Sequence, residues 1–447
     1  MDMTTNKTTF KKYPAYKESG MEWLGEIPKG WEVTKLKFLG SIYPGLSGKK
    51  GDDFSKDFNA TMKPFIPFTN IYNNFTINVN KYNFVKIGES EKQNKVKKYD
   101  LLFLMSSETL EDIGKCSLYD GENIELYLNS FCKGYRIKSP SVYPYFLNYL
   151  LKSDVYRAYF SIVGRGFTRI NIKQEYVNDL FTILPPLPEQ TAIANFLNEK
   201  TTKIDQAIAQ KEQLIALLKE RKQIIIQHAV TKGLDPNAKM KDSGVEWIGE
   251  IPEGWEVKKL KFLFDEINER SVEGTEELLS VSHMTGVTPR SEKDVNMFLA
   301  EDYAGSKLCR AGDVVYNIMW TWMGALGVSY QTGIVSPSYG VYRQKDSEVF
   351  NSEFLEYKFK SAEYIDYYNR VSTGLHSSRL RFYSHMFMGM EITYPNKEEQ
   401  DRIIENIKTQ STKIDQAITL QQTQIQKLKE YKATLIDSAV TGKIKVI

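Results

Sequence analysis

The sequence predicts an α+β protein in which two mixed α/β domains stand in tandem and are separated by two long helices. Three observations support this fold class. A helical segment occurs twice, a segment ahead of each domain occurs twice, and the regions between them are rich in short β-type runs. Repetition of this length indicates an internal duplication, so the expected architecture is a pseudo-twofold repeat.

The two long helices are predicted within residues 184–233 and 394–447, and each carries an apolar seam. Seam residues recur at steps of three, four or seven, which is typical of a helix that packs along its length against a partner. The second seam lies 210 positions after the first, and the heptapeptide TKIDQAI is repeated letter for letter. We therefore expect the two helices to pair. The predicted seam comprises Ile204, Ile208, Ile215, Leu218, Ile225, Ile414, Ile418, Ile425, Leu428 and Leu435.

The segment ahead of each domain, here called the leading segment, is repeated at a different shift. KESGMEWLGEIPKGWEVTKLKFL begins at Lys17 and returns 224 positions later as KDSGVEWIGEIPEGWEVKKLKFL. Weaker echoes continue inside the domains, where Gly164 and Arg169 match Gly374 and Arg379. The fold is therefore expected to repeat even where the letters have diverged.

These repeats define the expected boundaries of the domains. They are a disordered tail (1–16), a leading segment and first domain (17–183), a central helix (184–233), a linker (234–240), a leading segment and second domain (241–393), and a C-terminal helix (394–447). Runs such as FIPFTNIY, YDLLFLM, GYRIK, ELLSVSHM, GDVVYNIMW and YGVYR predict the strands of a mixed sheet. Apolar residues at helical spacing predict helices over 143–161 and 352–370.

Composition bounds the class of protein. The chain has 447 residues, of which 41% are hydrophobic and 26% charged, with a net charge of +3. No run approaches the ~18 apolar residues of a membrane span, and the first residues lack the apolar core of a signal peptide, so we expect a cytoplasmic protein. Three scattered cysteines form no CxxC pair and support neither a disulfide framework nor a zinc site.

A search for catalytic and cofactor motifs finds none that is complete. The four histidines lie in separate regions, and no HExxH motif or nucleophile elbow occurs. The segment from Gly45 to Lys50 is rich in glycine and lysine but lacks P-loop spacing, and Pro185-Pro186 lacks the flanking residues of an amino-methyltransferase motif. We therefore expect no metal, no cofactor and no catalytic activity in this chain.

The combination of repeats resembles one known family. SGxEWxGEIPxGWEV before each domain, PPLPEQ at the start of the first helix, and NIMWTWMGALGVS with GIVSPSYGVYR in the second domain resemble the DNA-specificity (S) subunits of type I restriction–modification enzymes. The resemblance covers nearly the whole chain, although the second helix begins with YPNKEEQ in place of the proline motif.

The resemblance implies a function for each part. Each variable domain would be a target-recognition domain that reads one half of a bipartite, asymmetric site in double-stranded DNA. The helices would form an antiparallel coiled coil that sets the spacer and docks two methyltransferase (modification) subunits, with restriction or translocase subunits as further partners. The specificity subunit itself would be non-catalytic, and a twofold arrangement of domains suits a duplex, which has the same pseudosymmetry.

Candidate base-reading residues are polar, aromatic or basic residues in glycine-containing loops. Arginine pairs with guanine and asparagine with adenine, whereas lysine and serine more often hold phosphate. In the first domain they are Ser47, Lys49, Lys50, Thr69, Asn70, Ser106, Ser107, Arg165, Thr168 and Arg169. In the second domain they are His283, Thr285, Asn317, Trp320, Trp322, Ser336, Ser338, His376, Ser378 and Arg379.

Two alternatives stay open at this point. A methyltransferase with fused recognition domains would be an enzyme and would bind the methyl donor by itself. A coiled-coil scaffold without DNA affinity would shift no duplex.

Overall fold

The computed structural model describes residues 10–446 except 59, 294–301, 375 and 377–379. The chain divides into two units, of which unit 1 comprises residues 1–211 with 423–447 and unit 2 comprises residues 212–422. Each unit contains one variable domain, its leading segment, and one half of each long helix. This confirms the predicted α+β class and its tandem repeat.

Unit 1 is built on an antiparallel sheet of four strands in the order β10-β8-β12-β4, and a second sheet has the order β11-β6-β7-β5. Strand β14 pairs with β3 and returns the chain to the first long helix, while β1 pairs with β2 and β9 with β13. The strands and short helices are β1 (Tyr16–Glu18), β2 (Glu26–Pro28), β3 (Glu32–Lys35), α1 (Leu36–Leu39), β4 (Gly40–Pro44), β5 (Phe54–Ser55), β6 (Lys63–Ile66), α2 (Phe68–Asn73), β7 (Asn83–Val85), β8 (Leu101–Leu104), β9 (Ser106–Ser107), β10 (Cys116–Leu118), β11 (Tyr127–Leu128), β12 (Cys132–Ile137), α3 (Pro144–Lys152), α4 (Asp154–Val163), β13 (Ile170–Asn171), α5 (Gln174–Asn178) and β14 (Phe181–Leu184).

Unit 2 repeats the central sheet with the order β18-β25-β22-β23, and β17 pairs with β26 as β3 does with β14. The pairs β15-β16, β19-β20 and β21-β24 complete its strands. The elements are β15 (Met240–Asp242), β16 (Glu250–Pro252), β17 (Glu256–Lys259), β18 (Phe264–Glu266), β19 (Leu279–Ser282), β20 (Gly286–Pro289), β21 (Lys307–Cys309), β22 (Val314–Tyr316), η4 (Thr321–Met323), β23 (Leu326–Val328), β24 (Gly333–Val335), β25 (Gly340–Gln344), α7 (Ser352–Phe359), α8 (Ala362–Val371), α9 (Ser384–Gly389) and β26 (Glu391–Tyr394), with single 3-10 turns η1 (Gly51–Asp53), η2 (Leu260–Phe262) and η3 (Arg290–Glu292) in the two units.

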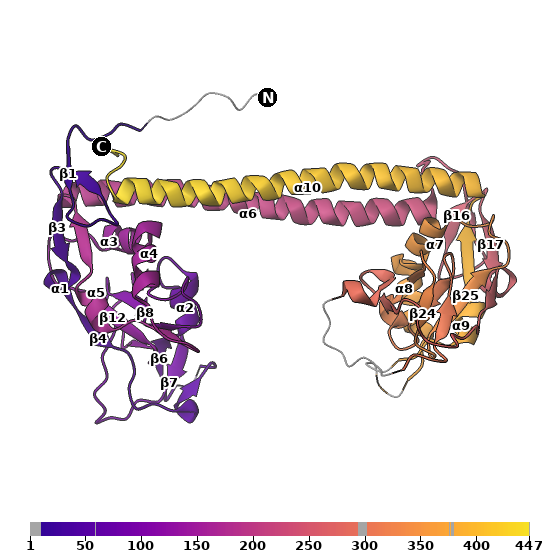
Figure 1. Ribbon diagram of the computed structural model, residues 1–447, viewed down its shortest axis with the longest axis horizontal. Helices are drawn as coiled ribbons and strands as arrows, with labels where there is room; N and C mark the ends of the chain where they lie inside the picture. Colours follow the sequence, from indigo (N-terminus) through magenta and orange to yellow (C-terminus); the bar gives the residue numbers. More distant parts are fainter. Residues whose placement is uncertain (1–9, 59, 294–301, 375, 377–379, 447) are drawn as a thin grey trace. The chain divides into compact units, whose positions relative to one another are not determined.

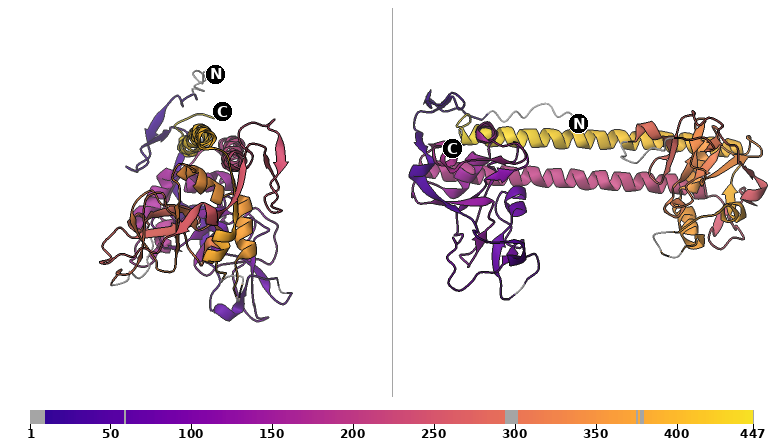
Figure 2. Two further views of the ribbon diagram at one scale, coloured as in Figure 1. Left: turned by 90° about the vertical axis from the view of Figure 1, so that its right-hand side faces the viewer. Right: turned by 60° about the horizontal axis from the view of Figure 1, so that its bottom comes forward.

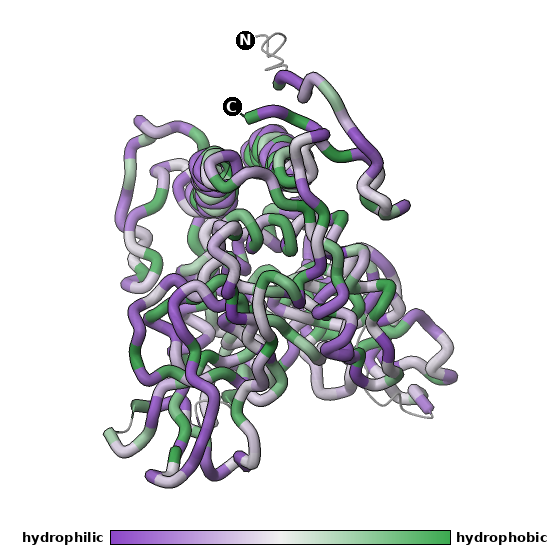
Figure 3. The backbone as a smooth tube through the Cα atoms, turned by 90° about the vertical axis from the view of Figure 1, so that its left-hand side faces the viewer, coloured by the Kyte–Doolittle hydropathy of each residue, from purple (hydrophilic) through white to green (hydrophobic). Residues whose placement is uncertain are grey.

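The long helices α6 (Leu187–Lys232) and α10 (Lys397–Val440) lie side by side within each unit as an antiparallel coiled coil (Figures 1 and 2). Every predicted seam residue is buried or half-buried, whereas most of the remaining helix surface is exposed. Seen end-on, both long helices carry hydrophilic and hydrophobic residues (Figure 3). No helix in the described part of the chain is long and apolar enough to cross a bilayer.

Two ion pairs link the long helices, and their residues occupy equivalent positions in the internal repeat. In unit 1, Lys432 Nζ lies 2.6 Å from the Asp205 carboxylate, and in unit 2, Lys222 Nζ lies 2.7 Å from the Asp415 carboxylate. Asp415 follows Asp205 by 210 positions, as Lys432 follows Lys222. These pairs are partly exposed, so each contributes at most about 1 kcal/mol, and the apolar seam supplies most of the stability of the coil.

Each predicted domain helix is broken in two, which the sequence analysis did not anticipate. The first breaks at Ser153 and the second at Lys360 and Ser361, between α3 and α4 and between α7 and α8. At each break a long helix supplies the missing cap: Asp154 N donates to Asp437 Oδ1 at 2.8 Å, and Ala362 N donates to Gln227 Oε1 at 3.3 Å. The two acceptors occupy equivalent positions in the repeat, so each break docks the domain on the coil.

A second difference concerns the run FIPFTNIY. Only Phe65 and Ile66 lie in β6, and Phe68–Asn73 forms α2. Pro67 between them has no N–H to donate to a neighbouring strand, so it ends the strand.

A buried glutamine fixes the start of each long helix to its domain. Gln190 donates to the carbonyls of Ser141 and Pro185, each at 2.8 Å, and its Oε1 accepts from the Tyr143 N–H at 2.8 Å. Gln400 repeats this arrangement with the carbonyls of Val349 and Pro395 and the N–H of Asn351, each at 2.9 Å. Both side chains are fully buried, and each of these contacts is to the backbone.

Residues 10–16 differ from the disordered tail that the sequence analysis expected. Lys11 forms a backbone bridge with Lys445, and Phe10 packs edge-on to Phe196 of α6 at 5.7 Å. Tyr13 donates its hydroxyl to Glu189 in the first turn of α6. Aromatic side chains that dock on the helix ends thus order this segment, and residues 1–9 lie outside the described part.

In both units a glutamate in the first turn of the long helix accepts a hydrogen bond from an aromatic side chain, but the donor differs between the units. In unit 2, Trp255 Nε1 donates to Glu399 Oε1 at 3.1 Å. In unit 1 the equivalent glutamate is Glu189, and its donor is Tyr13, whose ring lies 5.8 Å from the equivalent Trp31. The buried Nε1 of Trp31 then has no hydrogen-bond partner within the described residues.

This difference predicts a stabilising substitution in unit 2. The backbone hydrogen bond from Glu253 N to Lys239 O in unit 2 corresponds to the one from Lys29 N to Ala15 O in unit 1. This correspondence places Asn237 where Tyr13 lies in unit 1. Beside it is a cavity of about 510 Å³ that is lined by Trp255 and Glu399. Asn237→Tyr should fill that cavity and raise the free energy of unfolding by about 1 kcal/mol. Urea unfolding checks this, with Asn237→Ala as the control that should leave stability unchanged. A destabilised Asn237→Tyr would show that the cavity cannot admit the ring.

Candidate nucleic-acid interface

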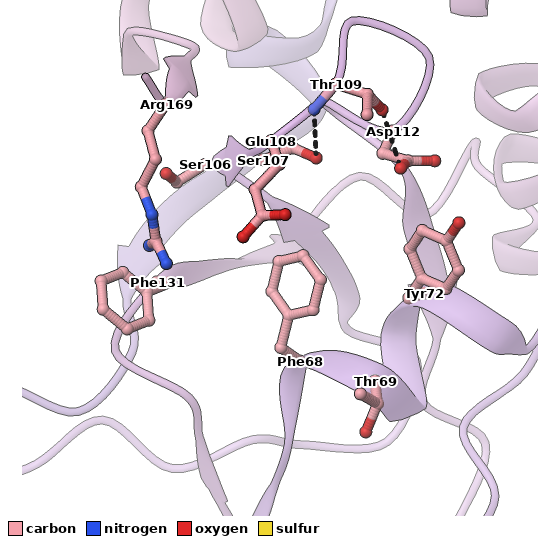
Figure 4. Close-up of a pocket in the computed structure, with 10 residues that line it drawn as sticks. All are labelled: Phe68, Thr69, Tyr72, Ser106, Ser107, Glu108, Thr109, Asp112, Phe131 and Arg169. Atoms are coloured by element: carbon pink, nitrogen blue, oxygen red, sulfur yellow. Dashed lines mark hydrogen bonds between the residues drawn. The ribbon is translucent and has the colours of Figure 1, made fainter. Parts of the chain in front are cut away.

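Four of the predicted base-reading residues of unit 1 line one cavity of about 480 Å³. They are Thr69, Ser106, Ser107 and Arg169, and they come from the start of α2, from β9 and from the loop before β13. The remaining lining residues are Phe68, Tyr72, Glu108, Thr109, Asp112 and Phe131 (Figure 4). The cavity therefore combines aromatic rings with a guanidinium, hydroxyls and carboxylates.

Strand pairing brings these distant residues together. β9 pairs antiparallel with β13, with Ser107 opposite Ile170 and Ser106 opposite Asn171. This short ladder places the loop that follows β8 beside the hairpin that carries Arg169. The loop is braced internally, since Thr109 Oγ1 donates to Asp112 Oδ2 at 2.8 Å (Figure 4).

Arg169 lies with its guanidinium over the ring of Phe131, 5.1 Å from the ring centroid (Figure 4). A cation–π contact is an electrostatic attraction to the face of the ring, and it occupies none of the five N–H donors of the guanidinium. The contact therefore restricts the side chain while its donors can still meet a planar acceptor such as the guanine edge. Phe131 is 54% exposed, so the pair lies at the surface, where a duplex could reach it.

Unit 2 carries a matching loop after β22, the strand that corresponds to β8. Trp320 and Trp322 stack with ring centroids 6.2 Å apart, and Trp322 Nε1 donates to Met319 O at 2.9 Å. Trp320 is 47% exposed. The corresponding loops of the two units therefore present different side chains, namely hydroxyls and carboxylates in unit 1 and indoles in unit 2.

Comparison with known proteins agrees with this geometry. Residues 28–219 match the family model of the type I restriction modification DNA specificity domain. A putative type I restriction enzyme MjaX specificity subunit from Methanocaldococcus jannaschii is 33% identical over 257 residues, and the alignment covers 55% of this chain and 56% of that protein. The type I restriction enzyme MjaVIII specificity subunit of the same organism is 23% identical over 454 residues, which cover 96% and 97% of the two chains. The crystal structure of the HsdS subunit from Thermoanaerobacter tengcongensis matches with a TM-score of 0.53 at 16% identity, covering 94% of this chain and 98% of that one.

The chain is thus similar to type I restriction enzyme specificity subunits over nearly its whole length. This chain spans about half the length of the first relative and nearly the whole length of the second.

Several residues predicted to read bases have structural roles instead of facing the cavity. Asn70 is buried, and its amide bonds the carbonyls of Asn78 and Lys81 and the N–H of Asn78. Asn317 is buried and donates to the Tyr339 hydroxyl at 2.8 Å. Sequence alone cannot distinguish a buried amide that closes a turn from one that reads a base, and we withdraw both from the proposed contacts.

The basic loop of the first domain lies apart from the cavity lining. Lys49 pairs with Glu91, and this hydrogen bond, together with those from Gln93 and the Gly88 N–H, lowers the pKa of the Glu91 carboxyl to about 2. Gln93 holds the same loop by donating to the Ser47 carbonyl at 2.8 Å. Lys50 is exposed. Of the two lysines of this loop, Lys50 is therefore the more accessible to a phosphate.

The other predicted residues lie on loops of both units. Arg165 donates to the carbonyls of Ile162 and Gly164 and so caps the end of α4, while Thr168 is exposed. In unit 2, His283 and Thr285 are exposed in the β19–β20 turn, Ser336 and Ser338 share a hydrogen bond of 2.9 Å, and His376 is exposed. Ser378 and Arg379 lie outside the described residues.

The structure adds cavity residues that the sequence analysis missed, chiefly Phe68, Tyr72 and Phe131. Aromatic residues in a β-rich region are expected in the core, so their types alone gave no signal. Phe131 had one usable clue, since it follows Asn129-Ser130, a pair typical of turns. Within the described residues, no three His, Cys, Asp or Glu side chains gather in a way that could hold a metal ion.

Proposed function

We propose that this chain is the DNA-reading, non-catalytic subunit of a type I restriction–modification complex. Each variable domain reads one half of a bipartite, asymmetric site in duplex DNA. The paired long helices set the spacer and dock two separate methyltransferase subunits, and restriction subunits join the same complex. The observation that carries the proposal is the cavity of unit 1, at the surface of a domain that the chain repeats. A strand pair brings Arg169 beside two serines there, and Thr69 of α2 completes the set.

The divergence of the domains supports an asymmetric site. The framework is repeated closely, since the leading segments, the central sheets, the glutamine anchors and the interhelical ion pairs all recur. The surface loops differ, since the Ser106–Asp112 loop faces the cavity in unit 1 and a tryptophan pair occupies the corresponding loop in unit 2. A repeated framework with different reading loops fits one duplex with two different half-sites.

Methylation-site sequencing tests the proposal directly. DNA from cells that carry this chain with its methyltransferase partner should show one split motif, with a methylated adenine on each strand. The purified chain alone should transfer no labelled methyl group. Transfer by the single chain would favour a methyltransferase with fused recognition domains, and a chain that shifts no duplex in the assembled complex would be a scaffold.

Substitution of the two equivalent arginines should impair recognition of different half-sites. Arg169→Ala should reduce discrimination at one position of one half-site by ~1–3 kcal/mol, because a bidentate guanine contact is lost. Arg379→Ala, at the equivalent position of the repeat, should affect the other half-site. Methylation kinetics on duplexes with single base changes measure both effects. Equal weakening on all duplexes with a lower salt slope would show that these arginines bind phosphate.

A further inference from the structure

The hairpin that carries Arg169 also presents a large apolar side chain in a fixed position. Arg165 N donates to Asn171 O at 3.1 Å and Asn171 N donates to Arg165 O at 2.8 Å, which closes the hairpin. Gly166 has a φ of 149°, and a Cβ there would lie 1.8 Å from the Arg169 carbonyl oxygen. Only glycine fits this turn, so the loop tip has a defined shape.

Phe167 occupies the tip and is 103% exposed, the highest value for a large hydrophobic side chain in the described part of the chain. A turn of this kind is determined by its glycine and its backbone hydrogen bonds, and it needs no aromatic residue at the tip. Full exposure of a phenyl ring is unfavourable in the free protein. The ring therefore contributes nothing to the stability of this hairpin and is available to a ligand.

The surroundings of Phe167 favour a nucleic acid over a protein as the ligand. The segment from Arg165 to Asn171 contains two arginines and no acidic residue. Arg169, two positions after the ring, lines the aromatic and polar cavity, where Glu108 supplies a carboxylate. A carboxylate at a DNA interface suits a cytosine amino group, whereas a phosphate would repel it. The hairpin thus combines cations with an apolar tip beside a site for base edges.

In unit 2 the same kind of backbone bridge closes a loop at the corresponding place, with bridging residues eight positions apart where those of unit 1 are six apart. Thr373 N donates to Arg381 O at 3.1 Å and Arg381 N donates to Thr373 O at 2.8 Å, as in unit 1. In the sequence a glycine, Gly374, follows the first bridging residue, and a large apolar residue, Leu375, comes next. Leu375 lies outside the described residues. A glycine, a large apolar residue and an arginine therefore occur in the same order in both loops, although the internal repeat aligns Gly374 with Gly164 and not with Gly166.

We propose that Phe167 is a wedge that inserts between two base pairs of the first half-site while Arg169 contacts the edge of an adjacent base. Apolar side chains that enter a base step unstack it and kink the duplex, and the energy of unstacking depends on the sequence of that step. Phe167 therefore contributes to specificity without a hydrogen bond to any base. This inference rests on the proposed DNA-reading function.

Base-stacking probes in the assembled complex test the wedge. With 2-aminopurine placed in turn at each position of the half-site, the wild-type complex should raise its fluorescence at one step, and Phe167→Ala should abolish that rise. Methylation of the matched duplex should fall about tenfold in kcat/KM. A mismatch at the same step, which is already unstacked, should restore most of the loss for Phe167→Ala. Phe167→Leu should be intermediate.

Two controls separate the wedge from other causes. Ile162→Ala, which removes another exposed apolar side chain near the end of α4, should leave both signals unchanged. If Phe167→Ala retains the wild-type fluorescence and rate while Arg169→Ala is impaired, the wedge is wrong and the DNA-reading function stands. If the wild-type complex prefers no duplex sequence, the proposed function fails and the wedge fails with it.

Discussion

Four residues inserted at the middle of both long helices should lengthen the spacer between the two half-sites by one or two base pairs. The insertions belong between Lys211 and Glu212 in α6 and between Gln422 and Thr423 in α10, where the chain passes from one unit to the other. One set of interhelical contacts, including the Asp205–Lys432 ion pair, lies on one side of these points, and the Lys222–Asp415 pair lies on the other. Insertions in both helices at these points therefore leave the interhelical contacts on each side intact.

The expected size of the change follows from helix geometry. Four residues add ~6 Å of helix at about 1.5 Å each, and one base pair of duplex occupies ~3.4 Å. One added pair is the expected result, because each pair also turns the groove by roughly 34–36°, which the relocated domain has to follow. An insertion of four is a stutter that a coiled coil absorbs by local unwinding.

Sequencing of the methylated motif made by the insertion variant measures the spacer. Paired insertions of two residues are the matched control. They turn the downstream seam by about 200°, at roughly 100° per residue, and should abolish activity by exposing it. An active four-residue variant with an unchanged spacer would show that the helices do not set the distance.

The stability of unit 2 should rise by about 2–3 kcal/mol between pH 7 and pH 9 because of one buried lysine. Lys358 of α7 is fully buried, donates to the Val230 carbonyl at the end of α6, and lies 5.1 Å from the ring of Trp255. Burial lowers the pKa of Lys358 to about 7, while the nearby Glu363 raises it and Lys232 lowers it further. The unfolded chain keeps an ordinary lysine pKa of ~10.4.

The direction of the effect follows from proton binding. Below pH 7 the lysine is protonated in both states, and the folded state bears the cost of a buried ammonium. Between about pH 7 and 10 the unfolded chain holds one more proton than the folded chain, so stability increases by roughly 1.4 kcal/mol per pH unit. Raising the pH through this window therefore stabilises unit 2.

Urea unfolding at pH 7 and pH 9 checks this prediction. Lys358→Met should remove most of the pH dependence, since an uncharged side chain of similar length replaces the amine. Leu150 occupies the equivalent, fully buried position of unit 1, which shows that the fold accepts an apolar residue there. Lys360→Met, at the break directly after α7 and partly exposed, is the control and should keep the wild-type slope. An identical slope in wild type and Lys358→Met would refute the assignment.

The repeated framework was predictable from the sequence because its signals are local and periodic. The seam from Ile204 to Ile225 and its copy from Ile414 to Leu435 can be read from spacing alone, and their burial confirms them. The breaks in the domain helices could not be read in this way, because the cap that permits the first one comes from Asp437, 283 positions away from Asp154. Tyr13 was missed for the same reason, since its partner Glu189 is 176 positions away.

The candidate interface was predictable only in part. Residue type and loop position were enough to predict Arg169 and Ser106 as candidates. The β9–β13 strand pair that places them in one cavity is visible only in the fold. The same reasoning also selected Asn70, whose amide is used inside the domain. Whether a polar side chain faces solvent or closes a turn depends on tertiary packing. The base-reading role of each cavity residue is a prediction that the substitutions above can test.

The glutamine anchors have a consequence for inheritance. Gln190 and Gln400 hold their domains through carbonyl and N–H groups alone, and every residue supplies a backbone carbonyl while every residue except proline supplies an N–H. If recombination introduces a variable domain with unrelated side chains, the glutamine can therefore form the same hydrogen bonds, because they involve only backbone groups. Under the proposed function, such a lineage acquires new DNA targets one half at a time, while the helices and the methyltransferase subunits proposed to dock on them stay the same.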